Sequence, residues 1–124
     1  MEEKKALIIT DESAIIQSIA HSIKDALSGI NVKIVTADKF AGNDILPVDI
    51  FILGCEKPNP ASFSYIEDML SHINLASRKC CIFSTNDQTV KYLKEIVKDC
   101  EADLAEPYLI IKDKLEKTDV NPWL

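Results

Sequence analysis

The chain has 124 residues, of which 47% are hydrophobic and 27% are charged, a composition that excludes a disordered protein and is typical of a folded globular one. This length predicts a single domain over residues 1–124, large enough to bury a core without disulfides or metals. No apolar run approaches the ~20 residues that span a bilayer, and no secretory signal follows the charged start. We therefore expect a cytoplasmic protein with no membrane partner.

The formal net charge is −6, and the Lys and Arg residues are scattered along the chain. Scattered bases give no positive patch for nucleic acid or an anionic membrane, so neither partner is expected. An acidic balance favours basic partners instead. The four cysteines have no C-x-x-C spacing, which predicts reduced thiols rather than disulfides or a zinc site.

The first part of the chain alternates strands with one clear helix. The continuous apolar run Ala6–Ile9 predicts a strand that is buried on both faces. An amphipathic helix follows, with Gly29 as its C-terminal cap. Asn31–Ala37 and Val48–Gly54 predict the second and third strands. The apolar positions of the helix recur every three or four residues: Ile16, Ile19, Ala20, Ile23 and Leu27.

The second part of the chain continues this alternation. Asn59 and Pro60 suit the N-cap and first position of a second helix. Lys79–Thr85 predicts a fourth strand, and Asp87 is a suitable cap for the third helix. Pro107–Ile111 predicts a fifth strand.

The cysteines and the C-terminal tail give less information. Cys80 and Cys81 are adjacent in a strand, so their side chains are expected on opposite faces, in the core. Cys100 lies on the apolar side of a helix, with the same expectation. Cys55 begins a turn, where its thiol is open to solvent if the turn is exposed. Residues 112–124 are mostly polar, and the sequence leaves open whether they pack on the core.

Strands that alternate with helices predict an α/β protein, a three-layer α/β/α sandwich with a parallel sheet. Five strands in this length fit the strand order 2-1-3-4-5. In such sheets, ligands bind beyond the carboxyl ends of the strands, at the switch point between the first and third strands. Three turns are expected there: Thr10–Ser13, Cys55–Pro60 and Ser84–Asp87.

Nearly the whole chain resembles flavodoxin-like domains. The similar segments are "KKALIIT…IIQSIAHSI", "DIFILGCEKP", "IEDMLSHINLASRKCCIFST" and "VKYLKEIVKDCEADLAEPYLIIKDK". This resemblance implies an FMN cofactor, electron transfer, and cofactor-binding residues in the three turns. The residues that it implies are Thr10, Asp11, Glu12, Ser13, Cys55, Glu56, Lys57, Ser84, Thr85 and Asn86.

The first turn departs from the flavodoxin pattern. The phosphate loop [ST]-x-T-G-x-T matches residues 11–16, where only Ser13 keeps a hydroxyl and Ala14 replaces the glycine. Two carboxylates beside a phosphate would repel it by roughly 1 kcal/mol per pair. In the alternative interpretation, Ser13 caps the helix, and Asp11 and Glu12 stabilise its first turn. The chain is then a cofactor-free binding or regulatory module with a protein partner.

The same turn, "ITDESAII", is also similar to the acidic turn of response-regulator receiver domains. Asp11 and Glu12 match the pair of acids that binds Mg²⁺ in that family. Gly54 stands at the phospho-acceptor position, however, and Glu106 stands where a lysine is expected. Phosphoryl transfer would lack its nucleophile and its charge stabiliser. This resemblance therefore predicts at most a non-catalytic pseudo-receiver module, with no catalytic residue and no metal site.

Overall fold

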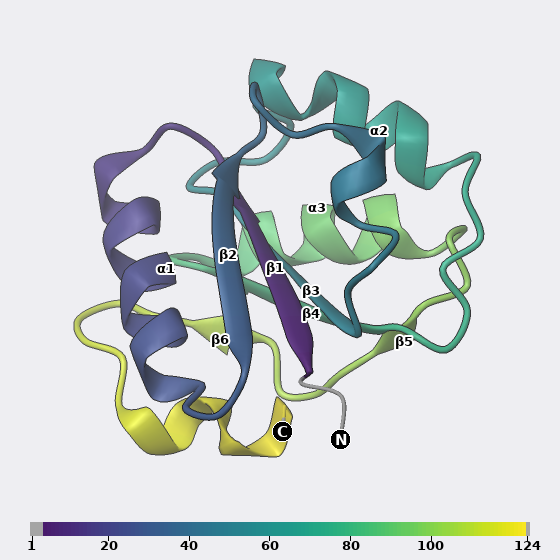
Figure 1. Ribbon diagram of the computed structural model, residues 1–124. Coiled ribbons are helices and arrows are strands. Elements are labelled where there is room, and N and C mark those ends of the chain that lie inside the picture. The colour runs from purple at the N-terminus through teal and green to yellow at the C-terminus, as the bar shows by residue number, and fades with distance from the viewer. Residues whose placement is uncertain (1–3, 124) are drawn as a thin grey trace.

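A parallel β-sheet forms the middle layer of the computed structural model, which describes residues 4–123 (Figure 1). Its neighbouring strands follow the order β2-β1-β3-β4-β5, with β6 also beside β4. The predicted order 2-1-3-4-5 is confirmed. The strands are β1 (Lys5–Thr10), β2 (Asn31–Thr36), β3 (Ile50–Gly54), β4 (Lys79–Ser84), β5 (Asp103–Leu104) and β6 (Leu109–Ile110).

The fifth position of the sheet is filled by two short strands. β5 pairs with the beginning of β4, and β6 pairs with its end. The prediction of one strand over Pro107–Ile111 is therefore wrong in its bounds. Pro107 has no backbone N–H to donate to a neighbouring strand, and the chain leaves β4 between β5 and β6.

Helices cover both faces of the sheet (Figure 1). The helix α1 (Ala14–Ala26) and the C-terminal 3-10 helix η3 (Lys117–Trp123) pack on one face. The helices α2 (Ser64–Leu70) and α3 (Asp87–Val97) pack on the other, with the short turns η1 (Gly42–Asp44) and η2 (Ala61–Phe63). Alternation along the strands fills both layers, so Cys81 faces α1 and Cys80 faces the opposite layer, as predicted.

The helix ends differ in detail from the expected caps. Asn86, not Asp87, is the N-cap of α3, because its side chain accepts the backbone N–H three residues further on. Asn59 has a φ of +56° and belongs to a turn, and Pro60 is the N-cap of η2 rather than the first residue of a long helix. Gly29 lies two residues beyond the C-cap of α1, with a φ of +83° that favours glycine.

The C-terminal tail packs on the core. Val120 and Trp123 are completely buried against α1 and the sheet. The indole N–H of Trp123 donates to the carbonyl of Pro107 at 2.9 Å, and the ammonium of Lys79 donates to the carbonyl of Trp123 at 2.6 Å. Leu124, the last apolar residue of the predicted tail, lies outside the described residues.

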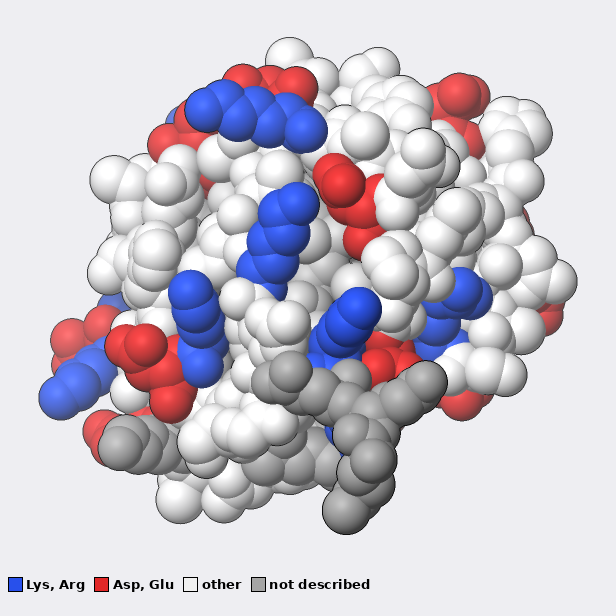
Figure 2. All heavy atoms as spheres, in the orientation of Figure 1, with Lys and Arg blue, Asp and Glu red and all other residues white. Residues whose placement is uncertain are grey.

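The visible surface carries acids and bases side by side. Figure 2 shows Lys and Arg interspersed with Asp and Glu over one face, without a large area of either sign. Among residues 4–123, no helix has the length and apolar character needed to cross a bilayer.

Candidate functional site

The three predicted turns meet at the carboxyl ends of β1, β3 and β4. The backbone N–H of Asp11 donates to the carbonyl of Gly54 at 3.3 Å. The hydroxyl of Ser84 donates to the carbonyl of Cys55 at 2.7 Å, and the amide of Asn86 donates to the carbonyl of Glu56 at 2.8 Å. The topology therefore brings the predicted residues together at the switch point, as the fold requires.

Asp11 fills the centre of this site with its own carboxylate. The side chain is buried, with only 7% of its surface exposed. One carboxylate oxygen accepts the N–H of Ser13 at 3.1 Å, and the other accepts the N–H of Glu56 at 2.9 Å. Burial raises the pKa of Asp11, and the two backbone N–H groups oppose that rise. Two donors that an incoming anion would use are therefore bound to the protein itself.

Ser13 is also fully engaged. It is the N-cap of α1, where its hydroxyl oxygen accepts the N–H of Ile16 at 3.4 Å. The same hydroxyl donates to a carboxylate oxygen of Glu56 at 2.7 Å. The predicted cap is confirmed, but Asp11 and Glu12 precede it and do not lie in the first turn of the helix. Glu12 is exposed and takes no part in this network.

The second turn is held by the beginning of α3. The carbonyl of Glu56 accepts the amide of Asn86 and also the hydroxyl of Thr89, the latter at 3.1 Å. Thr89 is completely buried and was not among the predicted residues. Its position three residues after the N-cap is the signal that could have found it, because an N-cap side chain reaches that residue. Thr85 lies beside Asn86, and Lys57 is exposed.

Three predicted residues, Thr10, Cys55 and Ser84, are completely buried beneath the surface of the site. Cys55 is completely buried, so an exposed thiol at this turn is ruled out, and its S–H donates to the carbonyl of Lys57. Burial, with a smaller contribution from the charge of Asp11, raises the pKa of the Cys55 thiol far above its usual value. A protonated buried thiol is not a nucleophile.

The ring of Phe83 closes the site from the α1 side. A Cβ atom placed on Gly54 would lie 2.2 Å from this ring. Phe83 is completely buried, so its ring cannot stack on a flavin. A side chain at the receiver-type acceptor position would collide with it. Within residues 4–123, no group of three or more His, Cys, Asp or Glu residues is placed to hold a metal ion.

The first turn does not fit the phosphate group of FMN. A phosphate needs free N–H and hydroxyl donors, because these replace the water that it loses. Here the carboxylates of Asp11 and Glu56 accept three such donors, the N–H and hydroxyl of Ser13 and the N–H of Glu56. They also bring negative charge to the place where the phosphate would sit.

Solved flavodoxin structures are similar to this chain over most of its length. The chain is similar to a flavodoxin from Streptococcus pneumonia TIGR4, with a TM-score of 0.78, 14% identity, and 95% of this chain and 90% of that chain covered. Flavodoxin 2 from Bacillus cereus matches with a TM-score of 0.76 and 22% identity over 91% and 89% of the two chains. The fold is flavodoxin-like. No protein-family model and no curated protein matches the sequence.

The flavodoxin-like neighbours include one with its cofactor. The Fusobacterium nucleatum flavodoxin bound to flavin mononucleotide matches with a TM-score of 0.69 and 13% identity, over 83% of this chain and 69% of that chain. These identities show a shared fold, and the fold by itself does not determine the ligand. The ligand is determined by the side chains of the turns.

The buried carboxylate of Asp11 has a testable pH signature. We expect the variant Asp11→Asn to be about 1 kcal/mol less stable at neutral pH, because one part-buried N–H loses its acceptor. A raised pKa means that the folded protein takes up a proton at Asp11 more readily than the unfolded chain, whose reference pKa is 3.8. The wild type should therefore gain stability relative to the variant as the pH falls through the folded pKa of Asp11 towards that value.

Urea unfolding of both proteins at a series of pH values measures this difference. A stability difference that shrinks as the pH falls would show that the backbone N–H groups outweigh burial and depress the pKa of Asp11 instead.

Proposed function

We propose that this chain is a flavodoxin-like module that binds a protein partner and does not hold FMN at its first turn. One observation carries the proposal: the hydroxyl of Ser13 donates to the carboxylate of Glu56 instead of facing solvent. The turn is thereby a closed, internally bonded corner of the fold. In this proposal the chain keeps the flavodoxin-like scaffold and binds its protein partner through another surface.

The proposal includes a cytoplasmic location and no nucleic-acid partner. The four cysteines are free and buried, and unpaired thiols persist in a reducing compartment. The formal charge of −6 disfavours a phosphate backbone as a partner.

The second candidate is electron transfer through bound FMN. The FMN-bound Fusobacterium nucleatum flavodoxin supports it through the shared fold. FMN would supply one- and two-electron redox chemistry, but the residues present at the first turn do not fit its phosphate.

A fluorescence titration of FMN separates the two candidates. We expect no quenching of FMN fluorescence by the purified chain, even with the protein in large excess, because Asp11 and Glu56 occupy the donors. Quenching in the wild type that is lost in Ser13→Ala, but kept in the matched variant Ser18→Ala on the exposed side of α1, would establish the second candidate.

A further inference from the structure

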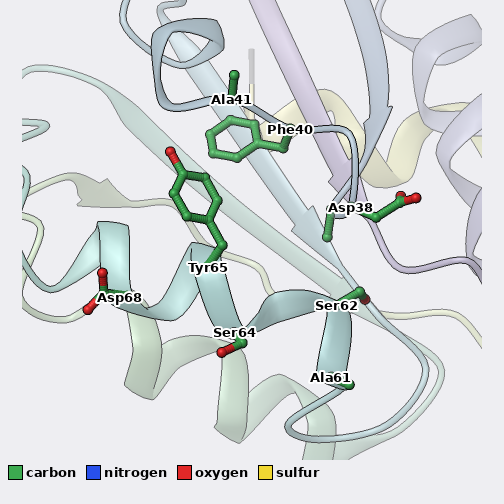
Figure 3. Close-up of a pocket in the computed structure, with 9 residues that line it drawn as sticks. Asp38, Phe40, Ala41, Ala61, Ser62, Ser64, Tyr65 and Asp68 are labelled. Carbon is green, nitrogen blue, oxygen red and sulfur yellow. The ribbon is translucent and has the colours of Figure 1, made fainter.

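A broad groove borders the three turns but is lined by other residues. It has a volume of about 860 Å³ and runs between residues 37–41, which follow β2, and the beginning of η2 and α2. Figure 3 shows the two segments facing each other across it. No residue of the turns 10–13, 55–57 or 84–86 lines this groove. Its lining is therefore distinct from the switch-point residues, although the N–H of Ala37 donates to the carbonyl of Thr10 at 2.7 Å.

An aromatic pair joins the two sides of the groove, with Phe40 on one side and Tyr65 on the other. Tyr65 is 48% exposed, and its ring centroid lies 6.0 Å from that of the buried Phe40. The hydroxyl of Tyr65 accepts the N–H of Gly42 at 3.0 Å, which fixes the orientation of the exposed ring. An exposed aromatic side chain that is already held in place loses little entropy on binding, as in the anchors of protein interfaces.

The charges in the groove are negative. Asp38 and Asp68 lie on either side of the aromatic pair, with their carboxylates directed away from the ring of Tyr65 (Figure 3). No Lys or Arg lines the groove. Asp38 forms no ion pair within residues 4–123. The one basic group in this part of the chain within ion-pair distance of the Asp68 carboxylate is Nδ1 of His72, at 3.7 Å. Lys39 follows Asp38 in the sequence but is not part of the lining.

We propose that this groove binds an arginine-bearing segment of a partner protein. A planar guanidinium can stack on an aromatic face such as that of Tyr65, or form paired hydrogen bonds with a carboxylate such as that of Asp38 or Asp68. Different arginines of the segment would use the ring and the aspartates, and each of these groups suits a guanidinium better than a compact ammonium. Ala37, Ala41 and Ala61 offer apolar contacts for the methylene groups of the arginine. Nucleic acid and other polyanions would meet two carboxylates. This inference rests on the proposed function and names the chemistry of its partner.

Two matched peptides test the proposal on the full chain. The probes are the acetylated and amidated tripeptides Arg-Ala-Arg and Glu-Ala-Glu, titrated into ¹⁵N-labelled protein and followed by NMR. We expect the arginine peptide alone to shift the amide signals of residues 38–42 and 61–68, with an affinity that falls as salt is added. Equal shifts from both peptides, shifts at another surface, or no shifts at millimolar peptide would each overturn the proposal.

Charge-neutral variants show which side chains contribute to the affinity for the peptide. Asp38→Asn and Asp68→Asn should each weaken the arginine peptide by about two- to fivefold, because each removes one charge pair at an exposed site. The control Asp113→Asn makes the same change of charge at an exposed position outside the groove and should leave the affinity unchanged. Tyr65→Ala should weaken binding by about threefold or more through loss of the stacked ring.

The variants keep the test decisive. The amide spectrum without peptide shows whether each variant is folded. If Tyr65→Ala does not fold, the two asparagine variants still test the proposal, because they remove no backbone hydrogen bond. Unchanged affinity in both asparagine variants would overturn the proposal. FMN binding by the chain would defeat the proposed function and leave the peptide result standing. Absence of both FMN and peptide binding would defeat only this inference.

Discussion

Trp123→Ala is expected to destabilise the protein by about 3–5 kcal/mol, although Trp123 lies one residue from the end of the chain. The side chain is completely buried against the layer that contains α1. Its removal leaves a large cavity and leaves the carbonyl of Pro107 without its indole donor. The change should also weaken the contact between the tail and the amino end of β4, because the ammonium of Lys79 donates to the carbonyl of residue 123.

Urea unfolding of the wild type and of Trp123→Ala measures the loss directly. The control is Asn121→Ala, two residues earlier on the exposed side of the same tail, which should change stability by less than about 0.5 kcal/mol. A loss below about 1 kcal/mol for Trp123→Ala would contradict the packing of the tail on the core.

Gly54→Ala is expected to destabilise the protein by about 1–3 kcal/mol, because the new methyl group would overlap the ring of Phe83. The Cβ atom would lie 2.2 Å from the ring, and both residues are in the core beneath the switch point. Phe83 cannot turn away without displacing side chains of α1, since the surrounding core is closely packed.

A double-mutant cycle with Phe83→Leu tests this collision. Phe83→Leu alone should be destabilising through lost contacts, but Gly54→Ala should cost less stability in that background than in the wild type. Thermal unfolding of the four proteins gives the coupling. Additive effects of the two substitutions would contradict a direct contact between the residues.

The fold could be predicted from the sequence because its signals are local. The apolar runs Ala6–Ile9 and Val48–Gly54 predict buried strands, and the three- and four-residue spacing in residues 16–27 predicts α1. The order of the strands then follows from the small number of topologies open to a short α/β chain. The divided fifth strand and the precise helix caps depend on single hydrogen bonds, which a pattern cannot locate.

Only the location of the candidate site could be predicted from the sequence, and not its chemistry. The fold brings three turns together, but their chemistry depends on pairs that are far apart in the sequence, such as Asp11 with Glu56 and Ser13 with Glu56. No local pattern indicates that a carboxylate from one turn will bond to the donors of another. The burial of Cys55 was missed for the same reason, since neighbouring elements cover its thiol.

The tail and the groove were also beyond sequence reasoning. A stretch with four apolar residues in thirteen has no clear period, and only the packing of Leu115, Val120 and Trp123 in the layer of α1 gives it a structure. The groove depends on the hydrogen bond from Gly42 to Tyr65, which joins residues that are 23 positions apart.

A crystal structure of the chain grown with millimolar FMN tests the central claim most directly. The claim is that the carboxylates of Asp11 and Glu56 occupy the N–H and hydroxyl of Ser13 and the N–H of Glu56, and so disfavour a phosphate at this turn. We predict no flavin density at residues 10–13, with the hydroxyl of Ser13 still bonded to Glu56. A phosphate bound at the beginning of α1, with the side chain of Glu56 turned away from Ser13, would contradict the claim.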